Sequence, residues 1–125
     1  MNRLSLAFFT AAAFCALVGM GWGMVMGATQ DFTTMPAHAH LNLLGWTSLA
    51  LMGGFYQLSG AGGRLGWINF GLSTCGVVLM IPTLALLMKG DTSLEPVVVA
   101  SSFIALLGMA TFVLAVLSVW RRAKA

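Results

Sequence analysis

Apolar residues fill four long stretches of this chain, and polar residues gather between them. The stretches cover about Leu4–Met26, Pro36–Leu58, Leu65–Met88 and Pro96–Trp120. A helix needs roughly 20 apolar residues to cross a hydrocarbon core of about 30 Å, and each stretch is long enough. The pattern therefore predicts an all-α fold, an integral membrane four-helix bundle that forms one transmembrane domain over residues 1–125.

The connections between the stretches carry turn residues and nearly all of the charge. They run from Gly27 to Met35, from Ser59 to Arg64 and from Lys89 to Glu95. Because each connection is short, consecutive helices are expected to be antiparallel neighbours.

Several residues also predict where helices begin or bend. Thr92 stands three residues before Glu95, which is the spacing of a capping box, and Pro96 follows in the first turn. Thr34 and Pro36 have the same roles at the second helix, with a weaker cap. Pro82 is expected to kink the third helix, because proline lacks an N–H group and its ring clashes with the preceding turn.

Basic residues lie almost entirely on one side of the predicted bundle. The side that holds both termini has Arg3, Arg64, Arg121, Arg122 and Lys124, whereas the other side has Lys89 alone. Cytoplasmic loops of membrane proteins carry an excess of Lys and Arg. The distribution predicts that both termini are cytoplasmic, in the inner membrane of a bacterium.

The composition agrees with a membrane environment. The chain is 59% hydrophobic and 7% charged, compared with roughly 25% charged residues in an average soluble domain. Its net charge of +3 comes from basic residues that stand singly or at the C-terminus, which we interpret as topology signals. We therefore expect membrane lipid, and no nucleic acid, as a partner.

The polar residues within the spans exclude several kinds of chemistry. No Asp or Glu lies inside a predicted span, which disfavours proton-coupled export because that function needs a carboxylate in the membrane. Ser48, Ser73 and Ser101 have no acid–histidine pair nearby in the sequence, so nucleophilic hydrolysis is disfavoured too. Asn69 and Gln57 are expected to bond only backbone or lipid headgroups.

Gly19, Gly23 and Gly27 repeat every four residues on the first helix. Small residues at this spacing allow close helix contacts in membranes. The pattern fits a homo-oligomer interface, and it fits packing inside the bundle equally well.

The two histidines, His38 and His40, stand at the outer end of the second helix. At 100° per residue they point about 200° apart, so they cannot bind one metal from a regular helix. An imidazole that faces the bundle is a good axial ligand for heme iron and a usable one for copper or zinc. In the alternative reading, both histidines only bond water, backbone or lipid phosphate near the interface.

Residues around the histidines are also suited to a cofactor. Gly45, Gly53 and Gly54 would give a flat porphyrin clearance on the same helix. Asn42 would lie one turn from His38 and orient a ring nitrogen. Trp46 sits deeper than a residue of the interfacial aromatic belt, so it either packs in the bundle or lines a cofactor pocket.

The motif His40-x-Asn42-Leu43-Leu44, followed by Trp46, Gly54 and Tyr56, resembles the second helix of the catalytic subunit (subunit I) of heme-copper oxidases and nitric oxide reductases. The resemblance covers this segment together with helix order and orientation. It implies a b-type heme with His40 as axial ligand and His38 as the second candidate. Asn42, Gly45 and Trp46 would then lie beside the cofactor.

The chain departs from that family in ways that change the expected function. Family members have many more helices, a second low-spin ligand on a later helix and further histidines around a heme–metal reaction centre. This sequence has two histidines in total. We therefore expect no oxygen or nitric oxide reduction, and a redox-associated role instead: electron transfer, sensing of a diatomic gas or support of a larger respiratory complex.

The sixth heme ligand and two other functions stay open. The ligand would be a second chain's histidine, a methionine or none, and the methionine candidates by depth are Met20, Met24, Met26 and Met88. The chain would alternatively be a structural or accessory membrane subunit. A third possibility is divalent-metal handling on the outer face, by Asp31, His38, His40, Asp91 and Glu95.

Overall fold

The computed structural model describes residues 1–123, and these fold into helices joined by short connections. Lys124, counted above among the basic residues near the termini, lies outside the described residues. The elements are α1 (Arg3–Thr29), α2 (Met35–His40), η1 (Leu41–Ser48), α3 (Leu49–Ser59), α4 (Gly63–Met88), η2 (Thr92–Leu94) and α5 (Glu95–Ala123). Because α2, η1 and α3 follow one another without a break, they form one continuous second helix, and the fold has the four helices that the sequence predicts.

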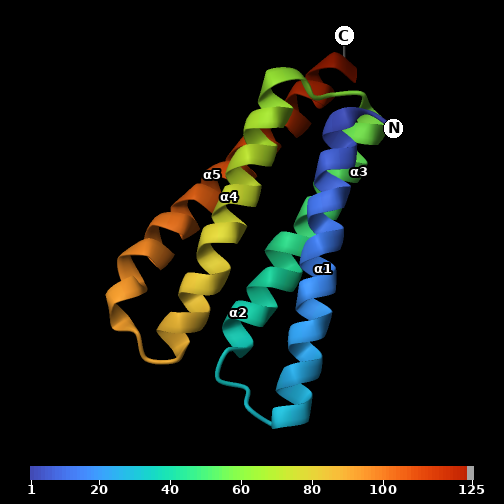
Figure 1. The fold of residues 1–125 in the computed structure, drawn as a ribbon. Helices are drawn as coiled ribbons and strands as arrows, with labels where there is room; N and C mark the ends of the chain where they lie inside the picture. Colours follow the sequence, from blue (N-terminus) through green and yellow to red (C-terminus); the bar gives the residue numbers. More distant parts are fainter. Residues whose placement is uncertain (124–125) are drawn as a thin grey trace.

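The four helices run antiparallel in chain order (Figure 1), with both termini at one end of the molecule and the connections after α1 and α4 at the other. Three helical segments are long and apolar enough to cross a membrane: Arg3–Thr29, Gly63–Met88 and Thr92–Ala123. The second helix matches the predicted stretch, but its π-helical middle divides it into shorter elements.

The π-helical segment η1 begins directly after His40. The hydroxyl groups of Thr47 and Ser48 donate to the carbonyl oxygens of Asn42 and Leu43, each five residues earlier, at 3.1 and 2.7 Å. These bonds follow the i to i+5 spacing of a π-helix, a form that is rare and often found at functional sites. The sequence predicts a regular α-helix here, and the structure differs over these eight residues.

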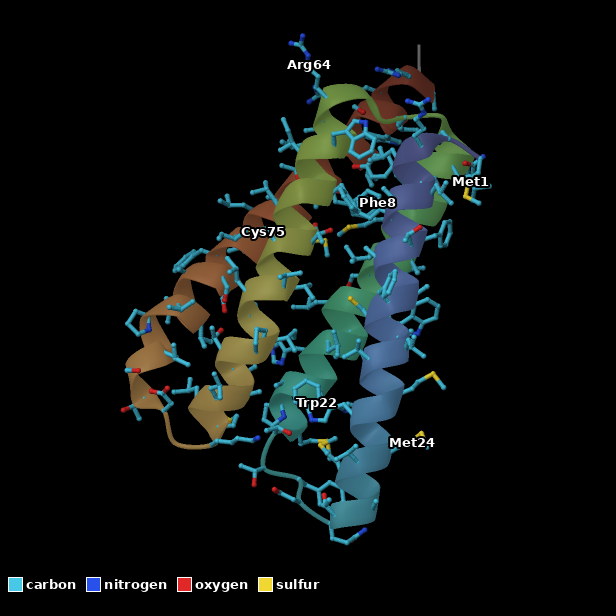
Figure 2. All side chains as sticks on the ribbon, in the orientation of Figure 1. Met1, Phe8, Trp22, Met24, Arg64 and Cys75 are labelled. Carbon is cyan, nitrogen blue, oxygen red and sulfur yellow. The ribbon has the colours of Figure 1, made fainter. Side chains whose placement is uncertain are left out.

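The largest apolar cluster lies toward the end that holds the termini. Its buried residues come from α1, α3 and α5: Leu4, Phe8, Ala12, Leu49, Met52, Tyr56 and Ala115. The rings of Phe8 and Tyr56 stack with centroids 5.5 Å apart, and Figure 2 shows Phe8 pointing between α1 and α4. A smaller cluster of Leu41, Val77 and Ile81 joins η1 to α4 nearer the histidines.

A buried polar network ties α3, α4 and α5 together. The Tyr56 hydroxyl donates to Asn69 Oδ1 at 3.1 Å, and Asn69 Nδ2 donates to the Gly108 carbonyl at 2.7 Å and to Ser73 Oγ at 3.2 Å. Asn69 is fully buried. The prediction that Asn69 bonds only backbone or headgroups is therefore wrong, because its amide links three helices inside the bundle, where polar groups need internal partners.

The helix starts differ from the predicted caps at Thr92 and at Thr34, whose side chain makes no capping hydrogen bond to α2. Asp91, rather than Thr92, caps the turn before α5, with its carboxylate accepting from the Ser93 N–H group at 3.2 Å. The predicted Thr92–Glu95 capping box is therefore wrong, because residues 92–94 form a 3₁₀ turn of their own. Pro36 lies in the first turn of α2 as expected, and α4 continues through Pro82.

Candidate functional site

His38 and His40 point to opposite sides of the second helix. The His38 ring contacts α1, whereas the His40 ring lies at a groove between the second helix, α4 and α5. This agrees with the separation of about 200° expected within a regular α-helix, because both residues precede the π-helical segment. The two rings therefore have different chemistry available to them.

His38 is held by polar contacts between α2 and α1. Its Nε2 atom lies 3.0 Å from the Gly19 carbonyl oxygen. Because a carbonyl only accepts, this contact is a hydrogen bond when Nε2 carries the proton. The Trp22 ring meets the imidazole edge to face at 6.3 Å between centroids, and the Trp22 N–H group donates to Thr34 Oγ1 at 3.1 Å. The Nε2 atom of His38 is thus already used inside the bundle.

Asn42 lies one turn from His38, as the sequence predicts. Its Nδ2 atom donates to the His38 carbonyl oxygen at 2.9 Å and lies 3.2 Å from His38 Nε2. Thr47 binds the Asn42 carbonyl in turn. Asn42 therefore fixes the region around His38 and does not contact the groove at His40.

Two of the repeated glycines on α1 provide the space for these polar side chains. A Cβ atom at Gly19 would lie 2.6 Å from Asn42 Oδ1, and one at Gly23 would lie 3.1 Å from His38 Nε2. A Cβ atom at Gly27 would meet nothing within 4 Å. Gly19 and Gly23 are thus used for packing within the chain, which is the second of the two readings that the sequence left open.

His40 has a free nitrogen in a defined tautomer. Its Nδ1 atom lies 2.7 Å from the Pro36 carbonyl oxygen, so Nδ1 must carry the proton. The other nitrogen, Nε2, then keeps its lone pair. Metal-binding histidines commonly donate their second ring N–H to a backbone carbonyl in this way, which fixes the ring and raises its basicity.

The groove at His40 has a volume of about 330 Å³. Its other lining residues come from η1, α4 and α5, and all but one are apolar: Leu44, Met80, Ser102, Ala105, Leu106 and Met109. Ligand pockets typically measure about 300–1,000 Å³ and combine apolar walls with few polar groups. The groove at His40 is at the small end of this range, and it has the same combination of apolar walls and few polar groups.

Met80 and Met109 are the methionines that share the groove with His40. Met80 is buried and Met109 is 38% exposed. The four methionines singled out by depth lie elsewhere: Met20 and Met24 are exposed on α1, Met88 is at the end of α4, and the Met26 sulfur contacts the Thr34 hydroxyl. Figure 2 shows Met24 pointing away from the other helices. Depth alone did not identify the methionines that face His40, because the groove depends on how three helices pack.

Two of the three glycines expected to give a porphyrin clearance lie against α1 instead. A Cβ atom at Gly45 would lie 2.8 Å from Cys15 Sγ, and one at Gly53 would lie 2.9 Å from Phe8 Cβ. Gly45 and Gly53 therefore allow α1 to approach, and that expectation was wrong for both; only Gly54 has open space. Trp46 is 42% exposed. Of the two expectations for this residue, the one that it packs in the bundle is therefore wrong.

The acidic residues of the outer end do not join the histidines. Within residues 1–123, no three His, Cys, Asp or Glu side chains lie close enough together to hold a metal ion. Asp31 accepts from the Thr33 hydroxyl and N–H groups at 2.6 and 3.0 Å. These hydrogen bonds, with a smaller contribution from Lys89, lower the pKa of Asp31. Asp31, like Asp91, therefore organises its own turn, and the predicted five-residue cluster is not formed.

Comparison with known proteins gives no match: no protein-family model, curated protein or solved structure matches the chain. Over the described residues, the structure is an all-helical bundle with three spans suited to a membrane and an apolar groove lined by His40. The resemblance to heme-copper oxidases therefore rests on the sequence motif that begins at His40 and on helix order and orientation.

Proposed function

We propose that this chain is a four-span protein of the bacterial inner membrane, with both termini cytoplasmic, that binds a b-type heme through His40. The observation that carries the proposal is the His40 ring: its Nδ1–H group is held by the Pro36 carbonyl, its Nε2 atom keeps its lone pair, and the residue lines an apolar groove. Neutral imidazole is a common axial ligand of heme iron.

The residues of the groove fit an axially ligated metal group. Pro36 orients the His40 ring, and Leu44, Ala105 and Leu106 provide apolar walls that exclude water. Met80 or Met109 would supply a thioether as the sixth ligand, as methionine does in some cytochromes. The groove is at the small end for such a group, so part of a porphyrin would face lipid.

A bound heme would supply one-electron chemistry or binding of a diatomic gas. The chain's own residues would hold the ring nitrogen at a fixed position and keep the site apolar, which are two of the means by which a protein tunes such a group. The proposed role is therefore electron transfer, gas sensing or support of a respiratory complex, without turnover of its own.

The same residues favour a second candidate, a bare copper(I) ion. One imidazole and two thioethers are soft ligands of the kind that select copper(I) over harder metals. The presence of Met80 and Met109 in one groove with His40 supports this reading. It needs less space than a porphyrin.

Visible absorption spectra of protein purified from heme-sufficient cells test the proposal. Oxidised and dithionite-reduced wild-type protein should show a Soret band and sharp reduced α and β bands, and His40→Ala should lose them while staying folded. A colourless wild-type protein would refute the heme proposal. Binding of copper(I) by that colourless protein, measured by competition with a chromogenic chelator and lost in His40→Ala, would establish the second candidate. Binding of neither would leave an accessory subunit.

A further inference from the structure

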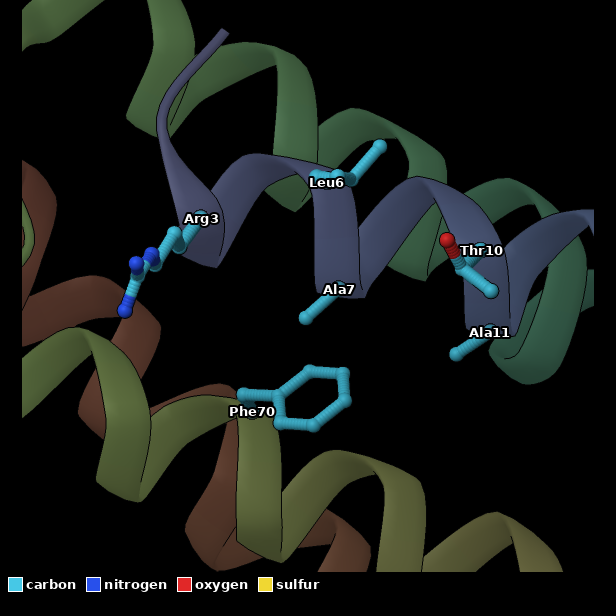
Figure 3. Close-up of a pocket in the computed structure, with 6 residues that line it drawn as sticks. All are labelled: Arg3, Leu6, Ala7, Thr10, Ala11 and Phe70. Atoms are coloured by element: carbon cyan, nitrogen blue, oxygen red, sulfur yellow. The ribbon is translucent and has the colours of Figure 1, made fainter.

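A larger groove lies at the opposite end of the molecule, between α1 and α4. It has a volume of about 490 Å³ and is lined by Arg3, Leu6, Ala7, Thr10, Ala11 and Phe70. Figure 3 shows Ala7 and Ala11 of α1 facing the Phe70 ring of α4, with Arg3 one turn nearer the chain terminus. The small alanine side chains leave the groove open along the direction of the helices.

A polar pocket adjoins the same arginine. It has a volume of about 250 Å³, and its lining includes Asn2, Arg3, Trp67 and the loop residues 60–63. Arg3 therefore separates an apolar groove along the helices from a polar pocket at their ends.

No Asp or Glu side chain lies near Arg3 to balance its charge. The three acidic residues of the chain, Asp31, Asp91 and Glu95, all lie in or beside the connections at the far end. Arg64, Arg121 and Arg122 lie at the same end as Arg3 and make that end more positive. A ligand for this place should have an anionic group attached to an apolar chain.

We propose that the two adjoining spaces bind one anionic phospholipid of the cytoplasmic leaflet. Its phosphate would pair with Arg3 in the polar pocket, and an acyl chain would lie along Ala7, Ala11 and Phe70. The guanidinium group binds phosphate well because its planar donors match the phosphate oxygens. This inference rests on the proposed membrane insertion with cytoplasmic termini, and it does not depend on heme or copper at His40.

Native mass spectrometry from mixed micelles of phosphatidylglycerol and phosphatidylcholine tests the site. Wild-type protein should retain one phosphatidylglycerol in preference to phosphatidylcholine. Arg3→Gln should lower that retention by about fivefold, the effect expected for one basic residue near an anionic headgroup. Ala7→Phe, which fills the apolar groove, should lower retention of both lipids at this site while Arg3 is still present.

Arg64→Gln is the matched control, because it removes the same charge at the same end from a side chain that lines neither space. Figure 2 shows Arg64 pointing away from the bundle. Equal losses in Arg3→Gln and Arg64→Gln would overturn the proposal in favour of general charge attraction, and equal retention of the two lipids by wild-type protein would overturn it outright. Displacement by millimolar inorganic phosphate alone would show a phosphate site without lipid.

The visible spectrum of the same samples separates this proposal from the heme proposal. Loss of lipid preference with an unchanged spectrum would refute the lipid site alone. A colourless protein that retains phosphatidylglycerol through Arg3 would refute heme binding and leave the lipid site standing.

Discussion

The two sides of the second helix carry the same kind of side chain in opposite situations. On the side toward α1, His38 is surrounded by Gly19, Gly23 and Asn42, and its Nε2 atom donates to a backbone carbonyl. On the other side, His40 has its Nδ1–H group paired and its Nε2 atom free beside an apolar groove. Residue type alone does not identify a ligand, because the two rings differ in what packs around them.

The largest expected effect on stability comes from placing a bulky side chain between α1 and the side of the second helix that carries His38. Gly19→Leu would force a side chain into the place of the Asn42 amide, since even a Cβ atom would lie 2.6 Å from Asn42 Oδ1. Overpacking of this kind typically costs about 1–3 kcal/mol, and the upper part of that range is expected. Gly21→Leu is the control, because nothing lies within 4 Å of its Cβ position. Unfolding in detergent should separate the two variants; equal stabilities would contradict the account of this side.

Removing each ring should affect stability unequally. His38→Ala leaves the Gly19 carbonyl without its side-chain donor and empties space between α1 and α2, which should cost about 1–3 kcal/mol. His40→Ala removes an exposed ring whose hydrogen bond is to its own helix, so the change should stay within about 0.5 kcal/mol. The same unfolding measurement compares them. A larger loss in His40→Ala would show that the exposed ring holds the helices together.

The sulfur atoms of the groove should change the cofactor rather than the fold. Met80→Leu keeps a similar volume and should cost less than about 1.5 kcal/mol. If the buried Met80 is the sixth ligand, the reduced visible spectrum and the midpoint potential should both shift, while Met109→Leu should have the smaller effect. Met24→Leu, on the exposed face of α1, is the control. Spectra unchanged by both groove substitutions would exclude a methionine ligand.

The smallest expected effect is on the stability of the fold at acidic pH. Hydrogen bonds from Thr33 lower the pKa of the Asp31 carboxyl group in the folded protein. A carboxylate with a lowered folded pKa adds stability above its unfolded pKa, and that stability is lost as pH falls through the folded pKa. Asp31→Asn should therefore remove a small decrease in stability below about pH 4. Salt should change this decrease little, because its main cause is the hydrogen bonds from Thr33 rather than the charge of Lys89. Identical acid profiles for the two proteins would contradict this role.

The sequence was sufficient to predict the helices, because the length of an apolar stretch is a local property of the chain. The predicted stretches agree with the observed helices to within a few residues, and the spacing of His38 and His40 correctly put them on opposite sides. Packing against other helices was harder to predict. The roles of Gly45 and Gly53 depend on the approach of α1, and the burial of Asn69 depends on a carbonyl 39 residues away in α5.

The groove itself could not be predicted for the same reason. Met80 and Met109 lie on two helices that follow the histidines by many residues, and only the arrangement of α4 and α5 brings them to His40. The π-helical segment after His40 also lacked a sequence signal, since its stabilising hydroxyl groups on Thr47 and Ser48 equally suit an ordinary helix.

The central claim is that His40, which lines the groove, is the ligand and that His38, which is packed between α1 and α2, is structural. Heme titration of purified His38→Ala and His40→Ala, followed at the Soret band, tests this most directly, with circular dichroism to show that each variant is folded. The account predicts that folded His38→Ala binds heme and that His40→Ala does not. Binding that is lost in folded His38→Ala and retained in His40→Ala would contradict it.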